Sequence, residues 1–228
     1  MYANLTCVCG RFTLTVPTFE DLKEALGLDV DATSSDVGTH RARFNIAPTD
    51  RTWIVTLEDG TLRAKLTRWG LDLRRSEEER PGRPMINLRA ESLRATPPDL
   101  GFATHRCVVL ADGFYEWRTG NPDKRPFYFR PDGDPLLLFT GVFTEKIGPP
   151  AFSIVTTQAR KSIADVHHRM PRLLNREEAQ RWLVGDGLGD ILKSEPTVPL
   201  LPVRVTTRAN AVKNDDAACI EIVSPEVG

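Results

Sequence analysis

The stretch RCVVLADGFYEW, which runs from Arg106 to Trp117, predicts a buried strand followed by a turn. Its first half is a short apolar run typical of a buried strand, and Asp112-Gly113 then predicts a turn that reverses the chain. Beyond this turn Glu116 stands between two aromatic residues. A carboxyl group held against apolar rings loses solvation, so we expect a raised pKa and a general acid near neutral pH. The alternative is an exposed glutamate on an aromatic-rich sheet edge.

Short strands of this kind, each bounded by glycine, proline or aspartate, recur along the chain. They are predicted at Phe12–Val16, Trp53–Leu57, Leu62–Trp69, Arg106–Leu110, Pro126–Phe129, Leu136–Phe143 and Phe152–Thr156. Helices are fewer: Thr18 caps one, which ends near Gly27. Asn175 and Glu178 form a capping box for a second helix over Arg176–Val184. This pattern predicts an α+β protein built around a strongly curved sheet.

The composition is that of a folded, soluble protein, with 40% hydrophobic and 27% charged residues among 228. The formal net charge of -1 gives no global attraction to nucleic acid or acidic membranes, so any DNA binding must come from a local groove. No apolar run approaches the roughly 18–20 residues of a membrane span, and the start lacks a signal-peptide pattern. We therefore expect a cytoplasmic protein that makes no contact with a membrane.

The cysteines are Cys7, Cys9, Cys107 and Cys219. The cytoplasm keeps thiols reduced, so a disulfide framework is not expected. No C-x-x-C pair is present, and the histidines show no zinc-ligand spacing with the cysteines. We expect neither a metal nor a cofactor.

Two further motifs place polar residues inside apolar runs, where an unpaired charge is costly. In MINLRAE, residues 85–91, strand alternation would put Asn87, Arg89 and Glu91 on one face. An Arg89–Glu91 ion pair on a wet sheet face is the alternative to a functional site. In DVHHRMP, residues 165–171, a histidine suited to proton transfer precedes Arg169, which could hold a phosphate. A surface loop is the alternative there.

In their order along the chain, these motifs resemble one family, the SOS response-associated peptidases, also called abasic-site processing proteins. The matching stretches are Cys9–Phe12, Arg43–Thr49, Arg68–Leu71, Asn87–Glu91, Ala111–Trp117, Phe139–Gly141, Ile154–Thr157 and Val166–Pro171. The resemblance implies one α+β domain over residues 9–223, with short strands in curved, barrel-like sheets, a few helices and a positively charged groove. Residues 1–8 would then be a non-native extension and residues 224–228 a C-terminal tail.

The resemblance also implies a chemistry. Family members find abasic sites in single-stranded DNA and bind them covalently through an N-terminal cysteine. The α-amine, with a reference pKa of about 7.7–8.0, forms a Schiff base with the sugar aldehyde, and the thiol then closes a thiazolidine ring. By this resemblance Cys9 is the nucleophile, Glu116 transfers protons, His167 assists and Asn87 orients the amine or the sugar.

DNA binding is assigned to arginines on the same basis. Arg89 and Arg169 would hold phosphates beside the lesion, and Arg11 is a further candidate; such contacts are blind to sequence. The implied partner is single-stranded DNA containing abasic sites, bound by a monomer that associates with the nucleoid. Abasic-site lyase activity and self-processing peptidase activity are implied as well. The alternatives are a cysteine peptidase that uses Cys9 and His167 on protein substrates, and a non-catalytic binder of single-stranded DNA.

Among the departures from the family pattern, three concern candidate site residues. With Met1 as the first residue, the nitrogen of Cys9 is acylated, so either cleavage after Val8 or a start at a GTG codon for Val8 must expose it. Arg75 stands near the place of a family tryptophan and would stack on a base instead. His168 replaces an acidic neighbour of His167, so we expect a lowered pKa for His167.

Overall fold

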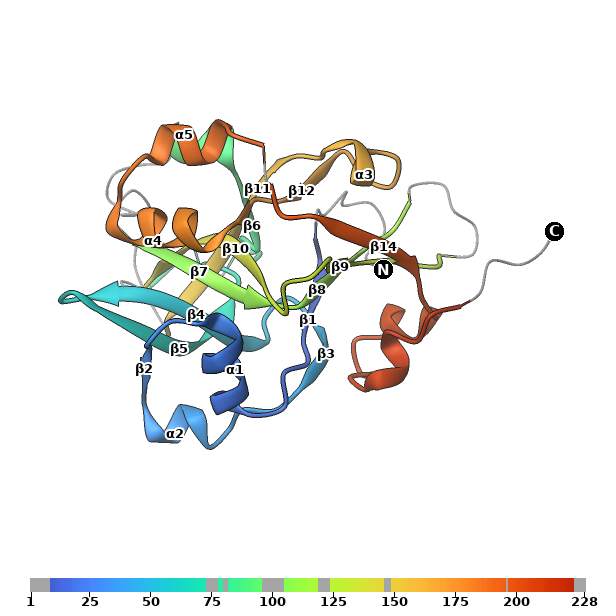
Figure 1. Ribbon diagram of the computed structural model, residues 1–228, viewed down its shortest axis with the longest axis horizontal. Helices are drawn as coiled ribbons and strands as arrows, with labels where there is room; N and C mark the ends of the chain where they lie inside the picture. The colour runs from blue at the N-terminus through green and yellow to red at the C-terminus, as the bar shows by residue number, and fades with distance from the viewer. Residues whose placement is uncertain are drawn as a thin grey trace.

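The structure is a computed structural model that describes residues 9–72, 78–79, 82–95, 105–118, 124–145, 149–195 and 197–223 (Figure 1). The strands are β1 (Arg11–Leu14), β2 (Asp31–Ala32), β3 (Arg43–Ile46), β4 (Arg51–Glu58), β5 (Thr61–Trp69), β6 (Asn87–Arg89), β7 (Arg106–Ala111), β8 (Gly113–Glu116), β9 (Phe127–Pro131), β10 (Leu137–Thr144), β11 (Ala151–Gln158), β12 (Arg169–Pro171), β13 (Leu173–Leu174) and β14 (Leu200–Arg204). The helices are α1 (Phe19–Leu26), α2 (Ser34–Val37), α3 (Lys161–Ala164), α4 (Arg176–Val184) and α5 (Leu188–Lys193), with 3-10 helices η1 (Ala90–Ala95), η3 (Thr207–Asn210) and η4 (Ala217–Cys219). The predicted α+β class is confirmed.

The helix boundaries follow from local capping. In α4, Asn175 Oδ1 accepts a hydrogen bond from Glu178 N at 2.8 Å, and Glu178 Oε2 accepts one from Asn175 N at 3.0 Å. This reciprocal pair satisfies two donors that the first turn would leave free, so the helix begins where the sequence predicted. Gly27 ends α1 with φ of 62°, a left-handed conformation that glycine adopts without steric penalty.

The strands are divided between two curved sheets. The smaller has the order β14-β9-β8-β1-β3, and the larger has the order β12-β11-β10-β7-β4-β5-β2. The first residues of β11 also pair in parallel with the end of β5, through Ala151↔Arg68 and Phe152↔Trp69. This extra pairing closes β4, β5, β11, β10 and β7 into a ring, which is the barrel-like arrangement that the family resemblance implied.

The chain passes from one sheet to the other at Asp112-Gly113. β7 pairs with β10 and β4 in the larger sheet, whereas β8 pairs with β1 and β9 in the smaller sheet. The prediction that this dipeptide reverses the chain was therefore wrong. The Asp112 carboxylate instead accepts hydrogen bonds from Thr15 N at 2.5 Å and from the hydroxyls of Thr13 and Thr15, which fixes the corner against β1.

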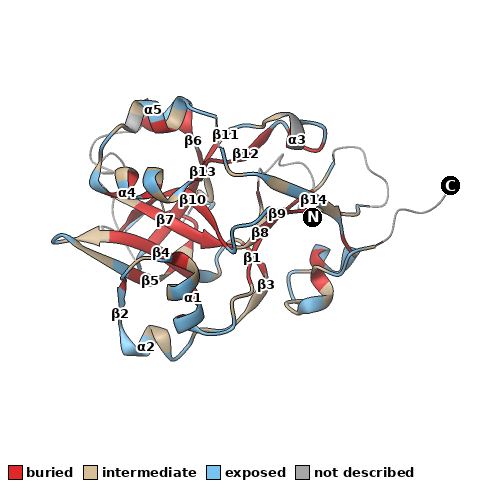
Figure 2. Ribbon diagram, viewed as in Figure 1, coloured by how far each residue is buried: buried red, intermediate tan, exposed pale blue. Residues whose placement is uncertain are grey.

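The core lies between the strands of the barrel and the helices that cover it, as Figure 2 shows in red. On α4, Trp182 is fully buried, and its Nε1 donates to Cys107 O at 3.0 Å in β7. The outer faces of α1 and α4 are exposed, so these helices screen the strands from water. Within the described ranges, no helix has the length and apolar character needed to cross a membrane.

Candidate active site

Cys9 and Glu116 meet at one end of the smaller sheet. Cys9 precedes β1, Glu116 ends β8, and the antiparallel register Arg11↔Tyr115 brings the two residues alongside each other. Cys9 N donates to Glu116 Oε1 over 2.5 Å, across 107 positions of sequence. Cys9 is completely buried and Glu116 is 2% exposed. Cys9 also has φ of 43°, a conformation rare for a residue with a Cβ, which the surrounding structure must hold in place.

Burial controls the protonation of Glu116. Loss of solvation raises its pKa to about 8, and this effect exceeds the opposing hydrogen bonds from the backbone N–H groups of Cys9 and Trp117. The predicted rise in pKa is confirmed, and the alternative of an exposed glutamate is wrong because the residue is buried. At neutral pH the carboxyl group is therefore mainly protonated and able to give up its proton.

A second group of predicted residues surrounds the end of β11. β6 lies parallel to β11 through Asn87↔Ile154 and Arg89↔Thr156, while β12 lies on its other side through Gln158↔Arg169. Asn87 is half-buried and Arg89 is exposed. In Figure 1, β6 and β12 both lie beside β11. The two motifs at residues 85–91 and 165–171 are thus brought together by strand pairing with a third segment.

Arg169 is held by Glu91. Its Nη1 and Nη2 donate to the two carboxylate oxygens of Glu91 at 2.7 and 2.9 Å, and Nη2 also donates to Thr156 O at 2.6 Å. The guanidinium lowers the pKa of Glu91, chiefly through these hydrogen bonds. The alternative pairing of Glu91 with Arg89 is not the ion pair that forms, because β6 ends at Arg89 and the chain then turns into η1.

His167 is buried beside this ion pair. Its Nδ1 accepts a hydrogen bond from Arg169 N at 3.1 Å, and its ring stacks on His168 with centroids 4.5 Å apart. Burial is the largest cause of its lowered pKa, and the charges of His168 and Arg169 add to the effect. The predicted direction is confirmed, although burial contributes more than His168. A neutral imidazole at this position is available to accept a proton.

Arg11 lies apart from these contacts. Its Nη1 donates to Asn45 Oδ1 at 3.0 Å and to Ala209 O at 2.6 Å, and burial lowers its pKa. Asn45 in turn donates to the carbonyls of Ala211 and Asn214. Arg11 and Asn45 therefore anchor the C-terminal 3-10 helices to β1 and β3. Sequence reasoning did not identify this link, since neither residue's partners are near it in sequence.

The structure thus describes two groups of predicted site residues, Cys9 with Glu116 and the cluster at β11. Helix α3 packs against both β12 and β14, so the β12 edge of the larger sheet adjoins the smaller sheet that carries Glu116. Arg75, residues 1–8 and residues 224–228 lie outside the described residues. Among the residues that are described, no group of three or more His, Cys, Asp or Glu side chains is arranged to hold a metal ion.

The chain is similar to known proteins over the region that contains the candidate site residues. A profile of the family described as SOS response associated peptidase (SRAP) matches residues 8–212. The abasic site processing protein YoqW of Bacillus subtilis (strain 168) is 29% identical over 226 residues, covering 94% of this chain and 99% of that protein. The abasic site processing protein YedK of Escherichia coli (strain K12) is 29% identical over 185 residues, covering 77% of this chain and 79% of that protein.

A solved structure shares the fold. The crystal structure of a protein from Bacteroides thetaiotaomicron superposes with a TM-score of 0.78 and 20% identity, covering 95% of this chain and 100% of that one. The family match spans most of the chain and includes Cys9, Glu116 and the cluster at β11. This protein is therefore a member of the SOS response associated peptidase family.

Proposed function

We propose that this protein recognises abasic sites in single-stranded DNA and cross-links to them through Cys9. The relatives are named abasic site processing proteins, which gives the substrate class. The observation that carries the proposal is the 2.5 Å contact between Cys9 N and Glu116, a buried carboxyl group with a pKa of about 8. An amine that attacks an aldehyde needs a proton donor at this distance.

A free α-amine has a reference pKa of about 7.7–8.0, and burial raises the pKa of Glu116 towards the same range. If Cys9 carried a free amine at the position of its backbone nitrogen, the amine and Glu116 would titrate as a coupled pair. The amine is then neutral in a substantial fraction of molecules while Glu116 keeps a proton to give.

The reaction proceeds in three steps. The neutral amine of Cys9 adds to C1′ of the open-chain sugar, and Glu116 protonates the carbinol oxygen, which leaves as water to form the Schiff base. The thiol of Cys9 then adds to the same carbon, and its proton returns to the Glu116 carboxylate. The nitrogen keeps one hydrogen in the resulting thiazolidine, so one amine, one thiol and one aldehyde give one ring and one water.

The residues at β11 would serve the sugar and its phosphates. Asn87 would orient the sugar or the amine, and neutral His167 would accept a proton when the sugar ring opens. Arg89 is the best candidate for a phosphate contact because it is exposed. Arg169 would have to exchange Glu91 for a phosphate, and Arg11 would have to leave Asn45.

The proposal requires that Cys9 be the N-terminal residue. A start at a GTG codon for Val8, followed by removal of the initiating Met, would expose its amine; GTT or GTC at codon 8 would eliminate this route. Self-cleavage between Val8 and Cys9 is the second route, supported by the family's peptidase name. Abasic-site lyase activity is a further outcome that the Schiff base would permit. The reaction would occur in the cytoplasm, at the nucleoid.

One experiment separates these functions. The chain beginning at Cys9 and the chain beginning at Met1 are incubated with an oligonucleotide carrying one abasic site and analysed on a denaturing gel. We expect a shifted band only when Cys9 is N-terminal and none after Cys9→Ala. Equal binding of both chains without any shifted band would favour the non-catalytic binder, and cleavage of protein substrates by the longer chain would favour the cysteine peptidase.

A further inference from the structure

A small pocket lies at the opposite end of β1 from Cys9. Its volume is about 160 Å³, which is below the roughly 300–1,000 Å³ of sites for drug-sized ligands. Leu14 forms part of its wall, five residues beyond Cys9 along an extended segment, so the two sites are about 16 Å apart. The lining residues are Leu14, Thr39, His40, Arg41, Arg43, Arg51, Thr52, Trp53 and Leu66.

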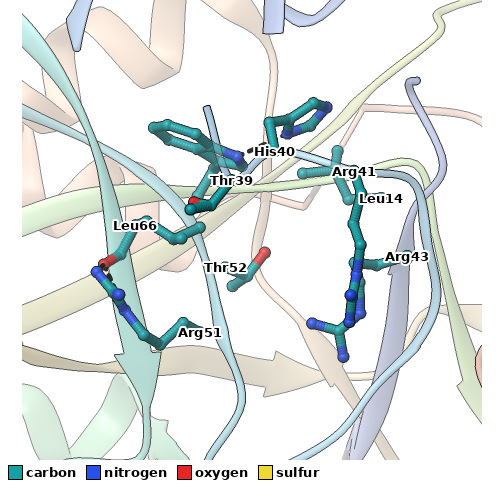
Figure 3. Close-up of a pocket in the computed structure, with 9 residues that line it drawn as sticks. Leu14, Thr39, His40, Arg41, Arg43, Arg51, Thr52 and Leu66 are labelled. Atoms are coloured by element: carbon teal, nitrogen blue, oxygen red, sulfur yellow. Dashed lines mark hydrogen bonds between the residues drawn. The ribbon is translucent and has the colours of Figure 1, made fainter. Parts of the chain in front are cut away.

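Among the described residues, three arginines line this pocket and no acidic residue does. Figure 3 draws Arg41 and Arg43 on one side and Arg51 on the other, with Thr52 between them. Register places Arg51 directly opposite Arg68 across β4 and β5, a like-charge pairing that Asp36 offsets in part from 3.5 Å away. The wall is thus built from cationic donors.

In the part of the chain that the structure describes, each of the three arginines has at least one side-chain N–H group without a hydrogen-bond acceptor. Within the described ranges, Arg41 makes no hydrogen bond or ion pair and is exposed. Arg43 uses Nε for Asp215 and Nη2 for Asp50, while Arg51 uses Nε and Nη2 for Leu66 O. The Nη1 groups of Arg43 and Arg51 have no hydrogen-bond acceptor in the part of the chain that the structure describes.

Three carboxylates, those of Asp36, Asp50 and Asp215, contact these arginines but do not line the pocket. Asp215 accepts hydrogen bonds from two backbone N–H groups of β3 at 2.6 and 2.9 Å, and Asp50 accepts one from Ala47 N at 3.1 Å. Asp36 accepts one from a backbone N–H of β5 at 3.3 Å and lies 3.5 Å from Arg51 Nη2. Backbone donors therefore satisfy part of each carboxylate, and these side chains hold the arginines in place without lining the pocket.

His40 keeps the opposite wall fixed. Trp53 Nε1 donates to His40 Nδ1 at 2.7 Å, and His40 Nε2 lies 2.9 Å from Val16 O. Because the indole can only donate and the carbonyl can only accept, the imidazole is neutral with its proton on Nε2. Both ring nitrogens of His40 are engaged, so the charged contacts that this pocket can offer a ligand come from the arginines.

We propose that this pocket is a second anion site that binds one phosphate group. Guanidinium groups match phosphate oxygens in geometry and charge, the pocket has the volume for such a group, and the positive charge of the three arginines would repel a metal ion. The phosphate could be free or part of a nucleic acid strand; only the second source rests on the proposed function.

The test is a calorimetric titration of the full chain with inorganic phosphate at fixed ionic strength. We expect saturable binding to one site, weakened about tenfold or more by Arg41→Gln. Arg130→Gln is the matched control, because Arg130 is also exposed and, within the described ranges, its side chain makes no hydrogen bond or ion pair. Its affinity should stay within about twofold of the unchanged chain. If inorganic phosphate shows no saturable binding, or binds Arg41→Gln as tightly as the unchanged chain, the proposed phosphate site is wrong.

A second titration identifies the source of the phosphate. Undamaged single-stranded oligonucleotides of increasing length are bound by the unchanged chain and by Arg41→Gln over a range of salt concentrations. If a strand supplies the phosphate, Arg41→Gln should reduce the salt slope by about 0.7 for the longer oligonucleotides only. An unchanged slope together with lost phosphate binding assigns the site to free phosphate. If no oligonucleotide binds, the proposed function is wrong, while the titration with inorganic phosphate still shows whether the pocket binds phosphate.

Discussion

Glu116 shows how burial changes the acidity of one side chain. The same carboxyl group in water would be ionised at neutral pH, but here burial holds its pKa near 8 and the Cys9 nitrogen lies 2.5 Å away. His167 shows the opposite effect, since burial lowers its pKa and keeps it neutral. One group can therefore give a proton and the other can take one at the same pH.

Glu116→Gln tests the proton-transfer role. The amide keeps the size of the side chain but has no proton to transfer, so we expect the cross-linking rate to fall by about 10²-fold or more at neutral pH. Non-covalent affinity for the abasic oligonucleotide should change little. The measurement is a quenched time course on a denaturing gel, with the exposed Glu177→Gln on α4 as control. Cross-linking at the unchanged rate would remove Glu116 from the mechanism.

At the scale of elements, the corner between β7 and β8 places Glu116. Because the chain changes sheets at Asp112-Gly113, β8 pairs with β1 and its last residue reaches Cys9. A Cβ on Gly113 would lie 2.1 Å from Tyr128 Oη, a contact that forces the ring to move. Tyr128 also shares a 2.9 Å hydrogen bond with Thr13, so the glycine is required for close packing at this corner.

Gly113→Ala should therefore destabilise the protein. Moving the Tyr128 ring disturbs packing and the bond to Thr13, and we expect a loss of about 1–3 kcal/mol in the free energy of unfolding. Urea unfolding measures the change. Gly82→Ala is the control, because no heavy atom lies within 4 Å of the position that its Cβ would take, and its effect should stay within about 0.5 kcal/mol. If Gly113→Ala and Gly82→Ala unfold at the same urea concentration, the corner between β7 and β8 tolerates a Cβ at residue 113.

At the scale of the whole molecule, β11 connects the barrel to the candidate site. It pairs with β10 and β5 at its start and with β12 and β6 at its end. The ring of strands provides a rigid support, and the strands that diverge from it carry Asn87, Arg89 and Arg169. A site built on paired strands holds its side chains more firmly than one built on loops.

In the chain that begins at Met1, where Cys9 N is an amide, stability should fall as the pH rises through the range in which Glu116 titrates. Its folded pKa of about 8 lies above the ordinary value of 4.5, so the folded state binds more protons than the unfolded state between these values. The free energy of unfolding should therefore decrease from about pH 5 to about pH 8, by roughly 3–5 kcal/mol. Urea unfolding at several pH values measures this, and Glu116→Gln should flatten the decrease. An equally steep decrease in that variant would assign it to other groups.

The exposed Arg89 should contribute to DNA affinity through charge alone. We expect Arg89→Gln to weaken binding to single-stranded DNA of any sequence and to reduce the slope of log affinity against log salt by about 0.7. Fluorescence anisotropy with labelled oligonucleotides measures both quantities. Arg130→Gln serves again as the control on the smaller sheet, and a slope unchanged by Arg89→Gln would exclude a phosphate contact at that residue.

The positions of most strands and the boundaries of α1 and α4 could be predicted from the sequence, because alternation and capping depend on residues close together in the chain. Its ordered motifs also identified Cys9, Glu116 and His167 as candidates. Three further features became visible only in the folded chain: the change of sheets at Asp112-Gly113, the pairing of Glu91 with Arg169, and the pocket lined by three arginines. Each of these depends on which strands pair across long stretches of chain, and local sequence patterns do not specify that pairing.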